Sequence, residues 1–101
     1  MGFYFNEKVE IDIKKTSKGF KITKFNTSIL DRDEKLYKGI DGLAMILVDS
    51  KYDEGKGFAV DSVVYQKDIK ENSVTVNSIT EITAVIAIDK YGNESNVTRV
   101  S

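Results

Sequence analysis

Lysine and aspartate side chains are the ones whose types and spacing could do chemistry in this chain, because it contains no histidine and no cysteine. It therefore lacks the usual general base near neutral pH, the commonest zinc ligand and a thiolate nucleophile. Zinc chemistry, cysteine hydrolysis and serine-histidine-aspartate triads are excluded on composition alone. Nothing in the sequence brings two carboxylates into a shared cleft, as glycosidases require. We accordingly expect no enzyme activity, no catalytic residue and no bound cofactor.

Five closely spaced lysines form the strongest local concentration of charge, with no acidic residue between them. One interpretation is contact with phosphate, with the weak and salt-sensitive affinity of non-specific nucleic-acid binding. The interpretation that we favour is structural: lysines that point outward from an early hairpin prevent edge-to-edge pairing of sheets between molecules. The chain contains no proline that could do the same. The five candidates for weak DNA contact are Lys14, Lys15, Lys18, Lys21 and Lys24.

The polar segment 49–57 concentrates carboxylates, which are the ligands that calcium prefers. Its spacing differs from that of a helix-loop-helix calcium loop. Lys51 would stand at the third position, and Glu54 would stand at the sixth, where glycine is needed. Two interpretations remain open: an irregular calcium site at one end of the fold, or a solvated loop between strands, which we favour.

Length and composition indicate a single domain over residues 1–101, with 41% hydrophobic and 31% charged residues and a net charge of -1. This charge argues against tight binding of nucleic acid over the whole surface. No apolar run approaches the ~20 residues that cross a bilayer, so we expect no membrane partner. The amino terminus lacks the basic start and apolar stretch of a signal peptide, which predicts a cytoplasmic protein.

Hydrophobic periodicity predicts that these residues are carried by β-strands. Val9, Ile11 and Ile13 alternate with charged residues, which is typical of a half-buried strand. A turn at 16–19 leads into a second alternating run. In that run Phe25 is out of phase with the apolar residues before it, which indicates a bulge or the end of the strand. The two runs predict a first hairpin.

The rest of the chain predicts five more strands and one irregular segment. The continuous apolar run at 43–48 indicates a central strand covered on both faces. In the strand at 82–89 we expect Ile86 to face the core, with Val85 and Ala87 on the opposite face. The five strands are predicted at 43–48, 58–65, 73–77, 82–89 and 94–100. Between 26 and 38 we expect a crossing between sheets, or a short helix capped by Asp31 and Glu34 with Leu36 and Tyr37 facing inward.

The last two strands are joined by a turn at 90–93, and the whole pattern predicts a closing β-hairpin. We assign Asp89 to accept hydrogen bonds from turn amides and Asn93, beside Gly92, to take a positive φ. Seven strands at this spacing predict an all-β, seven-stranded immunoglobulin-like Greek-key sandwich.

Residues 84–95 resemble the end of the sixth strand, the turn and the start of the seventh in bacterial fibronectin type III and related immunoglobulin-like modules. In those modules an alternating strand runs into Asp-x-x-Gly-Asn-x-Ser, which Asp89, Gly92, Asn93 and Ser95 match here. The chain lacks the tryptophan of a fibronectin second strand and the cysteine pair of antibody domains. The resemblance therefore implies the architecture and leaves the ligand open.

Residues 41–95 are also similar to the carboxy-terminal region of some methyltransferase subunits of type III restriction-modification systems. The similarity covers the strand that ends in Asp49 and continues to Tyr52 and Asp53, the later strand with Phe58, and the 89–93 turn. This resemblance implies an accessory module that follows a catalytic domain. The catalytic tetrapeptide and cofactor motif of such enzymes are absent from this chain, so no catalytic residue carries over.

These observations together predict a non-catalytic accessory or interaction domain. The leading context is a bacterial DNA-modification protein, with other domains of the same protein, or another protein, as partners. The alternative is a spacer or binding module of a secreted or cell-surface multidomain protein.

Overall fold

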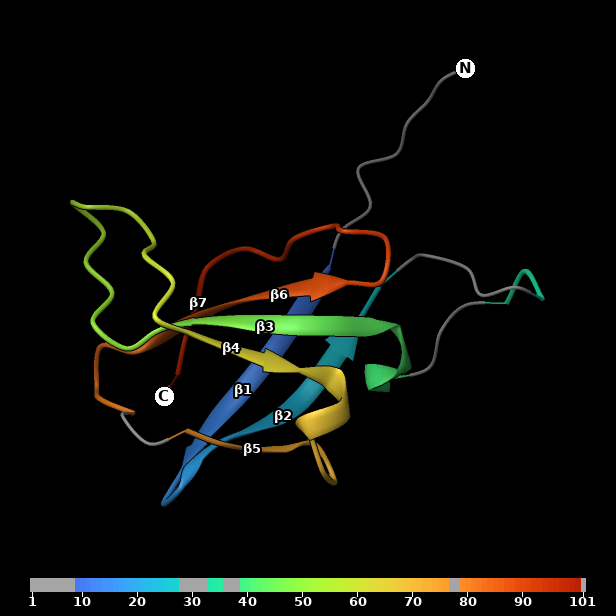
Figure 1. Ribbon diagram of the computed structural model, residues 1–101, viewed down its shortest axis with the longest axis horizontal. Coiled ribbons are helices and arrows are strands. Elements are labelled where there is room, and N and C mark those ends of the chain that lie inside the picture. The colour runs from blue at the N-terminus through green and yellow to red at the C-terminus, as the bar shows by residue number, and fades with distance from the viewer. Residues whose placement is uncertain (1–8, 28–32, 36–38, 77–78, 101) are drawn as a thin grey trace.

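The computed structural model describes residues 9–27, 33–35, 39–76 and 79–100, and seven strands in these ranges form two antiparallel sheets (Figure 1). The smaller sheet has the order β1-β2-β5, with β1 at Glu10–Thr16, β2 at Gly19–Asn26 and β5 at Ser73–Thr75. The larger sheet has the order β4-β3-β6-β7. Its strands are β3 at Leu43–Asp49, β4 at Ser62–Tyr65, β6 at Ala84–Asp89 and β7 at Thr98–Arg99. The predicted all-β class and the seven strands are confirmed.

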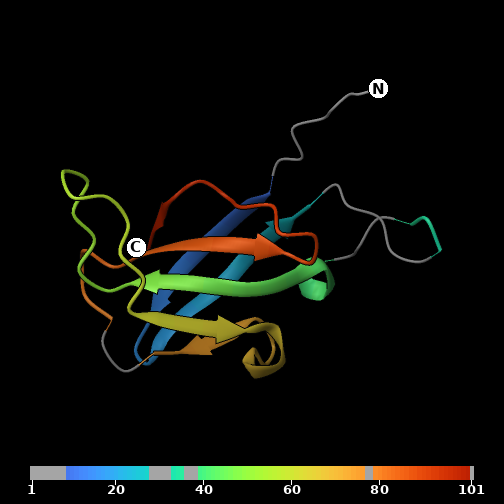
Figure 2. The same ribbon diagram turned by 45° about the horizontal axis from the view of Figure 1, so that its top comes forward.

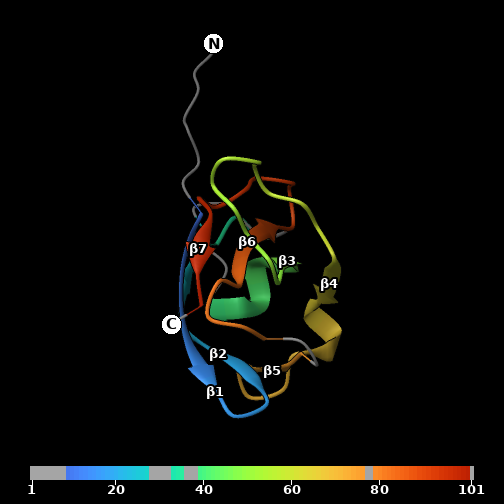
Figure 3. The same cartoon turned by 90° about the vertical axis from the view of Figure 1, so that its left-hand side faces the viewer.

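Two short 3-10 helices accompany the strands in the described ranges: η1 (Gly39–Gly42) precedes β3, and η2 (Gln66–Asp68) follows β4. No helix among the described residues is long and apolar enough to cross a membrane. Figure 3 shows the molecule from its side, with β7 of the larger sheet beside β1 of the smaller one. Figure 2 shows β3 in green between β6 in orange and β4 in yellow, so β4 lies at an edge of its sheet.

The hydrophobic core lies between the two sheets and contains residues of both. Phe20 and Ile22 of the smaller sheet and Leu43, Ile46 and Val85 of the larger one are almost completely buried. At one side of the molecule a parallel bridge between Val9 and Ser95 joins the sheets. Among the described residues, the core cluster consists of Val9, Ile11, Ile13, Phe20, Ile22, Phe25, Leu43, Ile46, Val48, Ile69, Val74, Val85, Ala87 and Val100.

The predicted first hairpin is confirmed, and so is the bulge predicted in its second strand. β1 pairs with β2 from Glu10 opposite Asn26 to Thr16 opposite Gly19. The register shifts between Asp12 and Ile13, and this bulge lies next to Phe25, the residue that was out of phase. The bulge matters because an extra residue on one strand reverses the side on which the following side chains lie. Phe25 therefore reaches the core and is only 4% exposed.

The orientation predicted for the sixth strand is wrong. Val85 and Ala87 are fully buried, whereas Ile86 lies on the opposite face. The ladder explains why: Val85 pairs with the buried Val48, and Ile86 pairs with the half-buried Leu47. An apolar run in which both sets of alternating residues are hydrophobic carries no sign of which set faces inward.

The continuous apolar run of the third strand predicted a strand that is covered on both faces. This prediction is wrong. Ile46 and Val48 are completely buried, but Met45 and Leu47 on the other face are only half-buried. Four strands are also shorter than predicted: β4 at 62–65, β5 at 73–75, β6 at 84–89 and β7 at 98–99. The predicted helical turn depends on Asp31, Leu36 and Tyr37, which lie outside the described residues.

Candidate interaction surfaces

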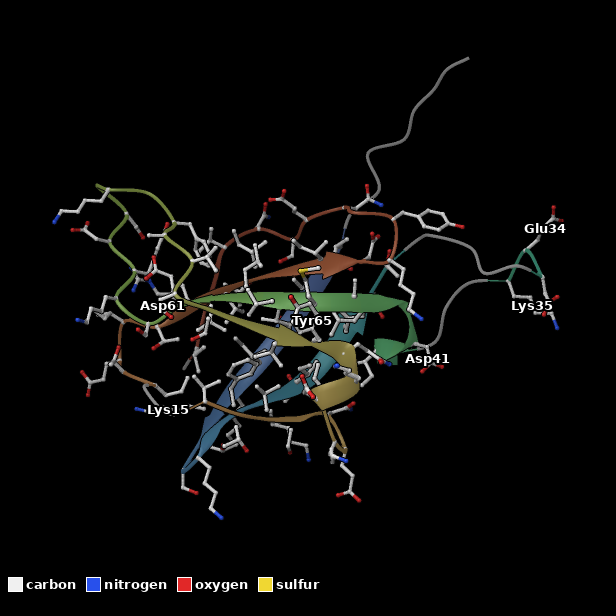
Figure 4. All side chains as sticks on the ribbon, in the orientation of Figure 1. Lys15, Glu34, Lys35, Asp41, Asp61 and Tyr65 are labelled. Carbon is white, nitrogen blue, oxygen red and sulfur yellow. The ribbon has the colours of Figure 1, made fainter. Side chains whose placement is uncertain are left out.

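The five lysines all lie in the first hairpin and are all exposed. Lys14 of β1 stands directly opposite Lys21 of β2, on the face of the smaller sheet that points away from the core. Lys24 stands opposite Asp12 on the same face. Lys18 is in the connecting turn, and Lys15 lies towards that end of the hairpin (Figure 4).

The position of β2 divides the lysines into two groups. Lys21 is on the part of β2 that pairs with both β1 and β5, where it protects no edge, whereas Lys24 lies beyond the residues that pair with β5. Lys14 and Lys15 are on β1, which is an edge strand. Edge protection therefore applies to Lys14 and Lys15 and not to Lys21. Placing Lys14 opposite Lys21 is unfavourable for the sheet, because like charges directly across a ladder repel. Contact with phosphate stays a prediction.

The carboxylates around the 49–57 loop bind the loop's own backbone. Asp49 accepts hydrogen bonds from the amide of Lys51 (3.0 Å) and the amide of Ala59 (2.8 Å). Asp61 accepts from both the amide and the hydroxyl of Ser50, at 2.8 and 2.6 Å. The hydrogen bonds from Ser50, the side-chain bond above all, lower the pKa of Asp61. These contacts close the two ends of the loop onto each other.

The same contacts bear on the calcium interpretation. Asp53 accepts a hydrogen bond from the amide of Gly55 at 2.9 Å, as a turn-forming aspartate does. Among the described residues no three acidic side chains come together in a group that could hold a metal ion. Asp49, Asp53 and Asp61 thus hold the turns of this loop, and the solvated loop stays the prediction that we favour.

Asp89 is a buried hydrogen-bond centre at the end of β6, with 1% of its surface exposed. It accepts hydrogen bonds from the amides of Tyr91 and Asn93, both at 2.9 Å, and from the Asn93 side chain at 3.0 Å. The Thr27 hydroxyl donates to it at 2.7 Å from the far end of β2. Burial alone raises the pKa of Asp89, but the hydrogen bonds from Asn93, Thr27 and the turn outweigh it and leave the pKa lowered.

The role predicted for Asp89 is confirmed, and that of Asn93 needs correction. The positive φ of the turn is at Gly92 (88°), whereas Asn93 is not among the described residues with a positive φ. Asn93 instead contributes its side-chain amide to Asp89. The bond from Thr27 was not predicted, because it joins residues 62 positions apart.

The sequence analysis also missed an exposed hydrophobic surface, which we call the outer apolar face. It covers the side of the larger sheet that points away from the core, and Figure 4 views this side and labels Tyr65 of the edge strand β4. Met45 pairs with both Tyr65 and Ile88, and Leu47 pairs with both Val63 and Ile86. The face thus consists of two rows across three strands, made of Met45, Leu47, Val63, Tyr65, Ile86 and Ile88.

The exposure of the outer apolar face is unusual for an antiparallel sheet, whose solvent side normally alternates with polar residues. Tyr65 is 49% exposed and Val63 is 40% exposed, and the other four residues are half-buried. The sequence contained an indication of this face, because the strands at 43–48 and 84–88 are hydrophobic at both alternating positions. We took this pattern to predict that both faces of the strand at 43–48 are covered, but no described segment covers the outer one.

Comparisons of the chain with protein-family models, with curated proteins and with solved structures found no match.

Proposed function

We propose that this chain is a non-catalytic immunoglobulin-like interaction domain that docks, through its outer apolar face, onto a neighbouring domain of the protein that contains it. The exposed double row of apolar side chains is the observation that carries the proposal. Contiguous apolar surface of this kind on a folded domain marks a site of interaction.

The order of the strands supports the immunoglobulin-like Greek-key part of the proposal. The chain passes between the sheets from β2 to β3, from β4 to β5 and again from β5 to β6. After the last passage β6 returns to lie beside β3 rather than beside its predecessor. Such a long return connection is the defining feature of a Greek key, and the closing β6-β7 pair carries the Asp89 turn that the resemblance identified.

The small number of residues in the face favours a tethered partner over a free one. The face consists of six side chains, whereas each partner in a stable complex of free proteins contributes about 20–30 residues and buries ~800 Å². Contacts between domains of one chain span about 600–1,500 Å² in total. Attachment to the same chain raises the effective concentration, so the smaller area is sufficient.

The context that we propose is a bacterial DNA-modifying protein in the cytoplasm, in which this domain follows a methyltransferase domain. It rests on the sequence pattern of residues 41–95, which resembles the carboxy-terminal region of methyltransferase subunits of type III restriction-modification systems and which the comparisons did not match. A methyltransferase motif upstream in the same reading frame is the expected finding. A signal peptide with further tandem β modules would instead favour the spacer of a secreted protein.

Site-specific photo-crosslinking tests the docking. A photoreactive phenylalanine analogue replaces Ile86, in the middle of the outer apolar face, in the full-length product of the gene. The matched control carries the same analogue at Thr23, which is exposed on the opposite sheet. Crosslinked peptides are identified by mass spectrometry after irradiation of the purified protein.

We expect crosslinks from position 86 to one defined region of the same polypeptide, and none to that region from position 23. Equal labelling from both positions, or reaction of position 86 with solvent alone, would contradict docking through this face. The Ile86→Thr variant provides a second measurement. It should weaken contact between the domains and leave the free energy of unfolding of the isolated domain within about 1 kcal/mol of the parent.

A further inference from the structure

Of the four sheet edges that the described strands form, one lacks the protection that the others have. β7 and β5 are only two and three residues long, and short edge strands give little template for pairing. β1 carries the exposed residues Lys14 and Lys15, and the bridge from Val9 to Ser95 ties its start to the other sheet. β4 has none of these features: its sequence is Ser-Val-Val-Tyr, without charge, proline or bulge.

The backbone of β4 is free on one side. Among the described residues β4 pairs only with β3, so its other side presents unpaired amide and carbonyl groups. Natural sheets rarely leave such a strand uncovered, because it recruits any extended chain that reaches it. The absence of protection on this one edge is therefore a feature to be explained.

A groove of about 450 Å³ runs beside this edge, between β4 of the larger sheet and β5 of the smaller one. Its volume is within the range of sites that bind ligands. Val63, Val64 and Val74 supply its apolar lining, and Ser73 and Thr75 supply hydroxyls. Asp68 and Lys70, one charge of each sign, lie in the segment that connects the two strands.

We propose that the β4 edge and this groove bind an extended, uncharged apolar segment of a partner protein, which adds to the larger sheet as a fifth strand. Backbone hydrogen bonds to β4 would hold the segment, as in other cases of strand addition. Its alternate side chains then point in two directions: one set enters the groove beside Val64 and Val74, and the other lies next to Val63 and Tyr65 on the outer apolar face.

The charges around the edge select the chemistry of the segment. β4 carries no charge, and the two charges in the groove are of opposite sign, so an acidic or basic segment gains nothing from them. Apolar side chains at successive positions match both surfaces that the added strand touches. β-branched residues fit best, because they favour the extended conformation.

A second copy of this chain fits the edge less well than a free segment does. In a pair of copies joined edge to edge, the inward side chains of each β4 remain packed in their own core, as Val64 is here, and leave the groove unfilled. The pairing would also involve only four residues of each copy. Each partner in a stable complex contributes about 20–30 residues. A segment that is not part of a folded sheet fills the groove with its own side chains.

The test uses the intact chain and the capped peptide acetyl-Ser-Val-Ile-Val-Thr-amide as probe. Binding is followed by NMR titration and by amide hydrogen exchange of residues 62–65. The control peptide has the same side chains but is N-methylated at every backbone amide, so that neither of its edges can donate hydrogen bonds to a strand. The edge variant is Val63→Lys, and its matched control is Val97→Lys, since the two valines are 40% and 38% exposed.

We expect the peptide to slow exchange at residues 62–65, and we expect N-methylation and Val63→Lys each to weaken binding about tenfold or more. Val97→Lys should change it by less than about twofold. Equal binding of the N-methylated peptide would overturn strand addition, as would the absence of any protection at millimolar peptide. Slower exchange that depends on protein concentration alone would show that a second copy is the occupant. Because Ile86 lies off this edge, the crosslinking result there stands or fails independently.

Discussion

At the scale of single residues, Gly19 is required by the close approach of β5 to β2. A β-carbon at this position would lie 2.0 Å from the carbonyl oxygen of Val74 and 2.9 Å from the amide nitrogen of Val76. These are backbone atoms, which cannot move aside without separating the strands. We therefore expect Gly19→Ala to lower the free energy of unfolding by at least about 2 kcal/mol, measured by urea denaturation. The control Ser17→Ala, at an exposed position of the adjacent turn, should stay within about 0.5 kcal/mol of the parent.

The second prediction at this scale concerns Asp89 and the pH dependence of the free energy of unfolding. Its native pKa is lowered, so its contribution to stability is complete above the ordinary aspartate pKa of about 3.9 and is lost as the pH falls through the native pKa. Asp89→Asn should cost about 1–3 kcal/mol at pH 7, because the buried site loses a charged acceptor. Urea denaturation at pH 7 and pH 3 should give a smaller difference for the variant than for the parent. An unchanged difference would show that Asp89 has no part in acid sensitivity.

At the scale of elements, the lysine-rich hairpin separates edge protection from phosphate contact. Neutralising Lys14 and Lys15 on the edge strand β1 should promote self-association, whereas neutralising Lys21, where β2 pairs on both sides, should not. Sedimentation velocity of the double threonine variant and of Lys21→Thr measures this. Duplex DNA titrations at low and moderate salt check the other interpretation. We expect no lysine-dependent binding, and a salt slope that falls by about 1 with each lysine replaced would establish phosphate contact.

The orientation of β6 gives a second prediction at this scale. Val85 is completely buried and Ile86 is on the outer apolar face. Val85→Ala should therefore cost about 2 kcal/mol or more, because the core retains a cavity. Ile86→Ala removes more atoms but should cost only about 1 kcal/mol, since its side chain is half-buried. The reverse order of the two losses, in the same denaturation assay, would contradict the strand pairing.

At the scale of the whole molecule, the core alone should be sufficient for folding. The core cluster draws on both sheets, and the loop carboxylates are hydrogen-bonded to backbone amides. We expect thermal unfolding of the isolated chain to be the same with and without EDTA, as monitored by circular dichroism. A midpoint lowered by many degrees in the chelator would return calcium to the 49–57 loop.

The outward sides of the two sheets differ in polarity. The outward side of the smaller sheet is polar and rich in lysine, and the outward side of the larger sheet is apolar. The β4 edge and its groove lie on the side of the molecule where the two sheets are not bridged. The polar side faces solvent, and we propose that the apolar side contacts a neighbouring domain and that the β4 edge takes an added strand.

The local sequence by itself determined the strands that alternate. In the first hairpin, charged residues between Ile11 and Ile13 specify which side is buried, and the phase change at Phe25 signals the bulge. The Asp89 turn was likewise predictable, because its hydrogen bonds run mainly between neighbours in the chain. Composition alone excluded chemistry that depends on histidine or cysteine.

Only the tertiary structure decided which side of the uniformly apolar strands faces inward. In an alternating strand, the positions of the apolar residues indicate which side is buried. The runs at 43–48 and 84–88 are hydrophobic on both sides, so their sequences do not indicate which side faces the core. Strand order then determined the rest: it left Leu47 and Ile86 on an open face, placed β4 at an edge, and brought Thr27 to Asp89. These features depend on pairing between distant segments, which the local hydrophobic pattern does not encode.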